Sequence, residues 1–297
     1  MAARTDTTGR TLVSDKEMGQ PRARFLYWIV LTLTTILFIL AFVFPLYWMF
    51  ASALKSPAEF AQPDPTLVPQ SFHPETYKQA WTRLDIAHFF LNTVYYAIGG
   101  WLVQLVVDVA AAYALSKLRP KLGNVILGLM LATLMIPAMV LIVPQYVTAI
   151  DLPIIHVNLL DSPWAIWLPL VANAFNIFLL KRFFDSIPED LIAAAQVDGA
   201  SPLRTLWSII LPMSRPILGV VSIFAVTAVW KDFLWPKLVM PSPETRTLSV
   251  GIYAFSGGTP QNVVIAAAVI SAIPTVIIFL LFQRNIMSGL TSGSLKG

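Results

Sequence analysis

The amino-acid sequence predicts an all-α membrane protein with six transmembrane helices. Hydrophobic residues make up 57% of the 297-residue chain and charged residues only 12%, whereas soluble domains contain about 25% charged residues. A helix needs about 20 predominantly apolar residues to cross the hydrocarbon core of a bilayer, and six segments meet or approach this length. A β-barrel would need short alternating segments instead. The predicted spans are residues 25–50, 89–115, 125–147, 163–180, 217–235 and 263–282.

The spans divide the chain into three parts. Residues 1–24 are rich in Thr, Gly and charged side chains and are predicted to form a disordered lead. Residues 25–282 form the transmembrane domain, and residues 283–297 form a C-terminal tail. Ala51-Ser52-Ala53 is similar to a signal-peptidase site. The apolar region of a signal peptide has only about 7–15 residues, so we expect residues 25–50 to remain as a membrane anchor.

The positions of Lys and Arg predict the orientation of the spans. With six spans, both termini lie on one side of the membrane, together with the loop at residues 181–216. Most of the 20 Lys and Arg residues fall on that side, and such residues are enriched in cytoplasmic loops. We therefore place both termini in the cytoplasm. The same bias accounts for the net charge of +4, so no nucleic-acid partner is needed to explain it.

The cytoplasmic loop at residues 181–216 is predicted to begin with a short helix. Ser186 and Glu189 have the spacing of a capping box, and Pro188 suits a first helical turn. Glu189 also places negative charge at the positive end of this helix. Gly199 is expected to end the helix, because glycine adopts a positive φ without steric cost.

A second short helix is predicted after the glycine. Ser201 followed by Pro202 is a typical N-cap with proline in the first turn, and Pro212 and Pro216 are expected to end the helix. A membrane protein that presents such a segment on its cytoplasmic side is expected to dock another protein there. The helix has an amphipathic run of Leu203, Leu206, Trp207 and Ile210.

Polar residues within the spans form two pairs. Gln104 and Asp108 lie four residues apart on one face of the second span, and Asn173 and Asn176 lie three apart in the fourth. Polar groups inside a bilayer face either a neighbouring helix or a water-filled path. Two interpretations therefore stay open, which are hydrogen bonding between helices and a solute translocation path.

The loops on the outer side are long. Residues 51–85 contain many prolines between Pro57 and Pro74, which predicts a non-helical segment that caps the outer mouth. Residues 241–262 combine apolar residues with a glycine-rich turn. This loop is a candidate contact for a partner outside the cell, and an ordinary connector is the alternative. The candidate contact residues are Tyr253, Phe255, Gly257 and Gly258.

The sequence gives no pattern of a self-contained enzyme. His73, His88 and His156 are far apart and lack carboxylate or cysteine partners at the spacing of a metal site, so no metal site is predicted. The chain contains no cysteine. It also lacks the glycine-rich Walker loop, the G-x-S-x-G elbow and the H-E-x-x-H motif.

The cytoplasmic loop resembles the EAA loop of ATP-binding-cassette (ABC) importer permeases. That motif has Glu-Ala-Ala, three residues, Gly, nine residues and Ile-x-Leu-Pro. Here Ala193-Ala194-Ala195, Gly199 and Ile209-Ile210-Leu211-Pro212 have this spacing, and Asp198-Gly199-Ala200 matches the carbohydrate-importer form. Ala193 occupies the place of the motif's glutamate.

The C-terminal tail, residues 289–297, is similar to that of the maltose-type permease subunit which lacks a long N-terminal insertion. Two further segments fit, Ala111 to Leu115 and Trp230 to Pro236, although Lys231 replaces the usual asparagine. The resemblance covers the chain after its first 24 residues. It implies the ABC type I importer permease fold in a bacterial cytoplasmic membrane.

The resemblance also implies partners. These are a second permease in a heterodimer, two ATPase subunits that bind ATP and Mg²⁺, and an extracytoplasmic solute-binding protein that delivers a sugar. No cofactor is expected in this chain itself. The implied ATPase-coupling residues are Glu189, Asp190, Leu191, Ala193, Ala194, Ala195, Asp198, Gly199, Ala200, Leu211 and Pro212. The implied ATPase-interface tail contains Gly289, Leu290, Thr291, Lys296 and Gly297.

Two other classes of function are alternatives. A secondary, ion-coupled transporter would hold carboxylates at mid-membrane and often has repeated halves, and only Asp108 points that way. An intramembrane enzyme would need a convergent set of catalytic residues, which the sequence lacks. The sequence does not identify the sugar.

Overall fold

The computed structural model describes residues 20–291, with side chains described as far as Leu280. Within this range the regular structure is helical, apart from an isolated β-bridge between Leu152 and Val157. The predicted all-α class is therefore confirmed. By length and composition, three helical stretches can cross a membrane, or up to six if each bent helix pair counts as one span. The three stretches are Pro21–Ala53, Ile86–Leu118 and Gln261–Leu280.

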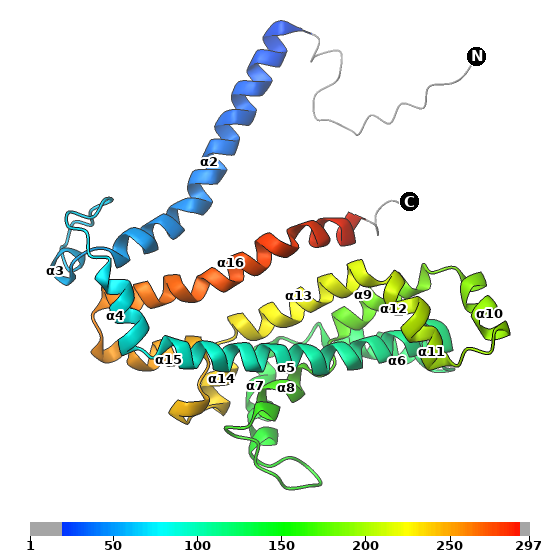
Figure 1. The fold of residues 1–297 in the computed structure, drawn as a ribbon. Coiled ribbons are helices and arrows are strands. Elements are labelled where there is room, and N and C mark those ends of the chain that lie inside the picture. The colour runs from blue at the N-terminus through cyan, green and yellow to red at the C-terminus, as the bar shows by residue number, and fades with distance from the viewer. Residues whose placement is uncertain (1–19, 292–297) are drawn as a thin grey trace.

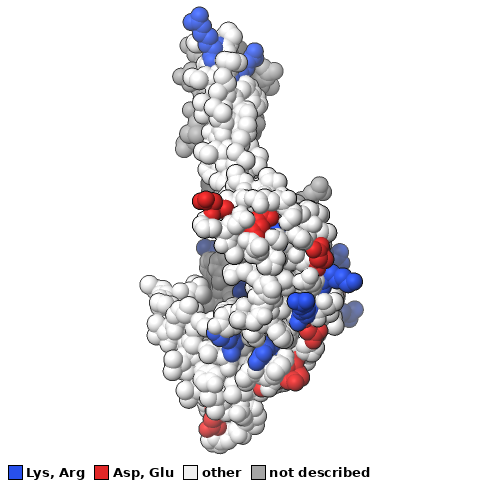
Figure 2. All heavy atoms as spheres, turned by 90° about the vertical axis from the view of Figure 1, so that its left-hand side faces the viewer, with Lys and Arg blue, Asp and Glu red and all other residues white. Residues whose placement is uncertain are grey.

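The first helix, α2 (Pro21–Ala53), stands away from the rest of the molecule (Figure 1). Only its last turn, Ala51 to Ala53, is buried, and the end of α2 packs against α16 (Gln261–Thr291). Figure 2 shows α2 as an uncharged column with basic groups at its tip. Such an apolar surface is expected where lipid or another membrane subunit covers a helix.

The segment between the first two spans is more helical than predicted. Two helices, α3 (Pro57–Phe60) and α4 (Glu75–Arg83), form within residues 51–85, so the expectation of a non-helical segment was wrong. The prolines permit this because Pro57 occupies the first turn of α3, and α4 begins after Pro74. In Figure 1 these helices lie at the opposite end of the molecule from α10 (Glu189–Val197).

The second span is the centre of the bundle. It consists of α5 (Ile86–Tyr113) continued by the π-helix η1 (Ala114–Leu118). Three helices pack along α5, namely α8 (Pro163–Leu170), α9 (Ala174–Asp185) and α13 (Arg215–Lys231), and α16 packs on α13.

The third and fourth predicted spans are bent helix pairs and not continuous helices. Helices α6 (Gly123–Thr133) and α7 (Ala138–Ile150) meet at 102°, with Pro137 at the break. Helices α8 and α9 meet at 50°, and Asn173 caps α9 through its side chain. Proline lacks an N–H and disfavours helix at the preceding residue, which accounts for the break before α7.

The fifth predicted span, residues 217–235, is also divided. Helix α13 ends at Lys231, and Asp232 has extended backbone before α14 (Leu234–Val239). The chain then forms η3 (Pro243–Thr245), α15 (Leu248–Phe255) and η4 (Ser256–Gly258) before α16.

Three hydrophobic clusters hold the bundle together. One joins α5, α9 and α13 to the segment after α10. Another joins α4, α5, α15 and α16 at the opposite end. The third joins α5, α8 and α14. The segment after α10 is therefore attached to the bundle through the cluster that it shares with α5, α9 and α13.

Candidate functional site

The candidate docking segment is a helix–turn–helix made of α10, α11 (Pro202–Thr205), the π-helix η2 (Leu206–Ile210) and α12 (Leu211–Met213). It projects from one end of the bundle (Figure 1). We refer to residues 188–213 as the docking segment.

Gly199 makes the turn between the two halves of the docking segment. Its φ is +76°, and its N–H donates to the carbonyl oxygen of Gln196 at 3.0 Å. The next N–H, that of Ala200, donates to the carbonyl of Ala195 at 2.9 Å, which is the bonding pattern of a helix that ends in a left-handed residue. The predicted chain break at Gly199 is confirmed.

The predicted caps had different outcomes. The Ser201 hydroxyl accepts from the Arg204 N–H at 3.3 Å, so the predicted N-cap of the second helix is confirmed. The capping box before α10 was wrong. Pro188 is the N-cap residue, and the Ser186 hydroxyl donates instead to the Phe183 carbonyl at 2.7 Å. Ser186 belongs to the end of α9, whose free carbonyls compete for its hydroxyl.

Polar contacts fix the docking segment and the residue before it to η1 and the adjoining end of α5. The Tyr113 hydroxyl donates to the Pro202 carbonyl at 3.0 Å, and the Lys117 ammonium donates to the Ile187 carbonyl at 3.0 Å. Arg119 forms an ion pair with Glu189. Glu189, one of the predicted coupling residues, therefore has a partner within this chain.

The docking segment exposes large apolar side chains among its charged ones. Five large apolar side chains are exposed: Leu191 (43%), Val197 (88%), Leu203 (69%), Trp207 (69%) and Met213 (42%). Leu206 and Ile210 point the other way and are buried. The amphipathic run is thus divided, with Leu203 and Trp207 outward at i and i+4. Exposed apolar groups that cluster together mark a candidate interaction surface.

The predicted coupling residues lie on this surface to different degrees. Glu189, Asp190, Leu191, Ala193, Ala194, Asp198, Gly199 and Pro212 are exposed, and Ala195, Ala200 and Leu211 are half-buried. The prediction left out Val197, Leu203 and Trp207. The helical periodicity of the run from Leu203 to Ile210 is the signal that could have identified Leu203 and Trp207.

The four polar residues predicted within the spans come together between α5 and α9. The Asp108 carboxylate accepts from the backbone N–H of Asn173 at 2.9 Å, and the Asn173 side chain accepts from the backbone N–H of Asn176 at 3.0 Å. Gln104, Asp108 and Asn176 are almost fully buried. This geometry favours hydrogen bonding between helices, because the carboxylate satisfies an N–H that the break between α8 and α9 leaves free.

Substitutions at Asp108 separate the two interpretations. Asp108→Asn keeps an oxygen that accepts from Asn173 and should retain both stability and solute uptake. Asp108→Leu leaves a buried N–H without a partner, which costs about 1–3 kcal/mol, and should lower the melting temperature in detergent. Loss of uptake by a stable Asp108→Asn protein would instead indicate that the ionised carboxylate lies on the translocation path.

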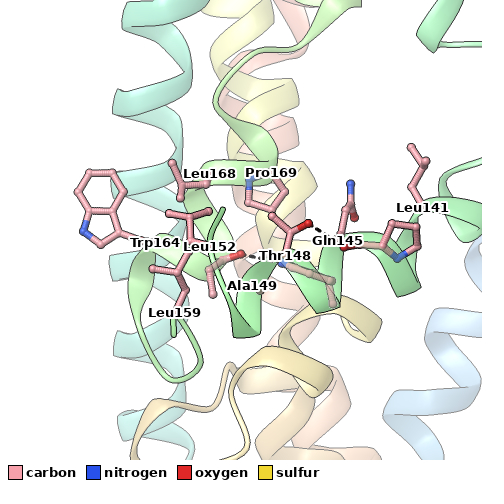
Figure 3. Close-up of a pocket in the computed structure, with 12 residues that line it drawn as sticks. Leu141, Gln145, Thr148, Ala149, Leu152, Leu159, Trp164, Leu168 and Pro169 are labelled. Carbon is pink, nitrogen blue, oxygen red and sulfur yellow. Dashed lines mark hydrogen bonds between the residues drawn. The ribbon is translucent and has the colours of Figure 1, made fainter. Parts of the chain in front are cut away.

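Two hollows lie away from this cluster, between α7, α8 and α14. One has a volume of ≈ 300 Å³ and the other ≈ 350 Å³, and both are lined by Gln145, Pro169 and Trp235. Figure 3 shows Gln145 and Thr148 on one side of the first hollow and Trp164 and Leu168 on others. A mostly apolar hollow of this size with a few polar groups fits a small organic ligand.

The loops around these hollows are joined by Asp161. Its carboxylate accepts from the Ser242 N–H at 3.0 Å, from the Ser242 hydroxyl at 2.7 Å and from the Thr245 hydroxyl. Partial burial acts to raise the pKa of Asp161, but these hydrogen bonds outweigh burial and hold the pKa below its ordinary value. The carboxylate therefore contributes stability at neutral pH, which is lost as the pH falls through its folded-state pKa.

Comparisons with known proteins bear on this architecture. The family model described as "Binding-protein-dependent transport system inner membrane component" matches residues 108–291, which include α9, the docking segment and α13. The chain belongs to this family. It is a transport permease, and its fold is that of an ABC importer permease.

Relatives of the permease agree along nearly their whole length. The chain is 32% identical over 259 residues to the sulfoquinovosyl glycerol transport system permease protein SmoH of Agrobacterium fabrum (strain C58), covering 86% of this chain and 89% of that protein. It is 28% identical to the melibiose/raffinose/stachyose import permease protein MelC of Bacillus subtilis (strain 168), covering 90% and 96%.

A solved structure has the same fold. It belongs to a bacterial ABC transporter involved in the import of the acidic polysaccharide alginate. The TM-score is 0.78 at 26% sequence identity, and the match covers 89% of this chain and 98% of the other. The two chains therefore share their overall helix arrangement over nearly their full length.

The loop at residues 253–258 of the permease presents aromatic side chains. Tyr253 is 53% and Phe255 41% exposed. The Tyr253 ring packs against Phe233 at 5.3 Å, and the Lys237 ammonium lies 4.1 Å from the Tyr253 ring centroid. Gly257 and Gly258 follow in η4, and both are exposed. The loop thus presents to solvent a surface formed by a lysine ammonium packed over aromatic rings.

The histidines of the permease are not as isolated as predicted. The His73 imidazole contacts Glu75 at 2.6 Å, and that of His156 contacts Asp151 at 2.9 Å, so the expected lack of carboxylate partners was wrong for these two. The sequence prediction missed them because it rested on metal-ligand spacing alone. Among the described residues, no group of three or more His, Cys, Asp or Glu side chains is arranged to hold a metal ion.

The C-terminal residues of the permease are only partly described. The backbone of α16 continues through Gly289, Leu290 and Thr291. Lys296 and Gly297 lie outside the described residues.

Proposed function

We propose that this permease is a transmembrane subunit of an ATP-driven, binding-protein-dependent sugar importer. The observation that carries the proposal is the docking segment, which combines exposed apolar side chains with a rigid attachment to the bundle. An ATP-driven permease that has no ATP-binding motif of its own needs such a surface to bind a separate ATPase. The family membership of the chain supports the same conclusion.

The proposed coupling uses the docking segment as a lever. Two partner ATPase subunits hold ATP and Mg²⁺, and one of them receives α10 and the exposed pair Leu203 and Trp207. Movement of that ATPase would be transmitted through the contacts of Tyr113 and Lys117 to α5, because these bonds link the docking segment to the central helix. Rocking of rigid helical units then provides alternating access. This chain itself performs no hydrolysis.

The proposed solute is a sugar, and an oligosaccharide fits best. The relative MelC, which is named for the import of melibiose, raffinose and stachyose, supports this assignment. Within the chain, the hollows lined by Gln145 and Trp235 provide an amide and an aromatic ring, which suit the hydroxyls and the apolar faces of a sugar ring. We place the solute path beside these hollows, with the Asp108 cluster as its structural support.

The remaining partners follow from the exposed surfaces. The apolar surface of α2 fits the bilayer and a second, different permease subunit. The aromatic loop at residues 253–258 fits an extracytoplasmic solute-binding protein. In this arrangement the docking segment, both termini and the tail at residues 289–297 face the cytoplasm of a bacterial cell, where the tail contacts the ATPases.

Solute uptake tests the energy source. Membrane vesicles that contain the assembled importer should take up sugar when ATP is supplied and the ion gradients are collapsed. A secondary transporter would give the opposite result, because its driving force is the gradient. Uptake that persists without ATP and stops with the gradient would overturn the proposal.

Trp207→Ser tests the docking surface. Buried tryptophans are frequent hot spots in interfaces, so we expect the affinity for the ATPase to fall on the order of tenfold or more. Trp81→Ser is a matched control, because Trp81 is 47% exposed on α4 at the other end of the bundle. Equal ATPase co-purification by the Trp207→Ser and wild-type proteins would argue against this surface.

A further inference from the structure

A basic hollow lies beside the docking segment but is not part of it. It has a volume of ≈ 440 Å³ between η1, the start of α6 and α9. Three cations line it, Arg119, Lys121 and Lys181, with Asp185 as the acidic residue among them. Unlike the hollows near Trp235, its lining is mainly polar.

The positive charge in this hollow is only partly neutralised. Lys181 pairs with Asp185 at 2.8 Å, and Arg119 pairs with Glu189. Lys121 has neither an ion pair nor a hydrogen bond from its side chain among the described residues, and it is exposed. The hollow therefore holds one cation in excess, which an anion of single negative charge would balance.

An apolar stripe begins at the edge of the hollow. Leu122, Val125, Ile126 and Leu129 are 65%, 58%, 45% and 66% exposed. They follow the spacing i, i+3, i+4 and i+7, so they form one face of the helix α6 and its first turn. The long second span also ends here, at Leu118, which sets the hollow at the depth of the lipid headgroups.

We propose that the basic hollow binds the headgroup of an anionic phospholipid. Lys121 contacts the phosphodiester, and Arg119 and Lys181 contribute positive electrostatic potential. An acyl chain lies along the stripe from Leu122 to Leu129. Charge complementarity selects the anionic headgroup, and the adjoining stripe selects a lipid over a free anion. The proposal requires a membrane-embedded chain and does not depend on how the ATPases are coupled.

Lipid binding to the purified, assembled importer in detergent tests this site. Native mass spectrometry should show tighter binding of phosphatidylglycerol than of phosphatidylcholine with the same acyl chains. Lys121→Gln should weaken phosphatidylglycerol binding about fivefold, as expected for one basic residue at an anionic lipid surface. Lys121→Arg should restore the binding, and raised ionic strength should weaken it.

A control variant and a competing anion distinguish a lipid site at Lys121 from general surface charge and from a small-anion site. Lys78→Gln removes an exposed cation on α4, at the opposite end of the bundle, and should leave lipid binding unchanged. An equal loss in this variant, or equal affinity for the two lipids, would overturn the proposal. Full displacement of the lipid by inorganic phosphate would also overturn it, because the hollow would then be a site for a small anion.

Discussion

Gly199→Val should abolish ATP-driven uptake and release the ATPases from the membrane complex, while the protein still inserts. Gly199 has a φ of +76°, a conformation that costs an ordinary L-residue about 1–2 kcal/mol and a β-branched residue more. The turn would open, and α11 would no longer present Leu203 and Trp207 beside α10. Co-purification of the ATPases and uptake by vesicles measure the effect.

Gly199→Asn is the matched control for this change. Asparagine tolerates a positive φ better than other residues, and a Cβ at this position has open space around it. We therefore expect the asparagine variant to keep most of its ATPase binding. If valine and asparagine fail equally, the requirement is for a small surface and not for the backbone conformation. Normal uptake by Gly199→Val would refute the role of the turn.

Gly99→Val is expected to destabilise the fold strongly. A Cβ at Gly99 would lie 2.2 Å from Cζ2 of Trp167 and 2.5 Å from its Cε2, so α5 and α8 would have to separate. Trp167 is not free to move, because its indole N–H donates to the Tyr96 carbonyl at 3.0 Å. Overpacking of this kind costs about 1–3 kcal/mol or more. The melting temperature in detergent and the yield of monodisperse protein should both fall.

Two further variants identify the cause. Gly128→Val adds the same side chain to α6, where nothing lies within 4 Å of the new Cβ, and should leave the melting temperature unchanged. The double variant Gly99→Val with Trp167→Leu removes the clashing ring and should recover part of the loss, as a positive coupling in a double-mutant cycle. No recovery would show that the backbone of α8, and not the ring, limits this position.

The sequence predicted the fold class and the docking segment because both depend on local patterns. Apolar length identified the membrane helices, and Gly199 with Ser201 identified the turn and the cap. The capping box failed because Ser186 had two acceptable partners, and only the position of the end of α9 decided between them. Leu203 and Trp207 were visible as part of an amphipathic run, but the run does not state which side faces the bundle.

The breaks within the spans were harder to predict. Pro137 was visible, yet a proline in a membrane span can bend a helix slightly or end it. The 102° angle at this position is a property of the tertiary structure, in which α7 packs against α14. The contact between Gly99 and Trp167 joins residues far apart in the chain, so no local pattern contained it.

The sequence by itself determined that this protein is a helical membrane permease with a docking loop. Hydropathy, charge bias and the spacing around Gly199 are properties of short segments, so each can be evaluated without knowledge of the others. Only the tertiary structure brought Asp108 to the free N–H of Asn173, joined Arg119 to Glu189 and formed the basic hollow around Lys121. These features depend on distances between separate helices, which packing sets and sequence spacing does not.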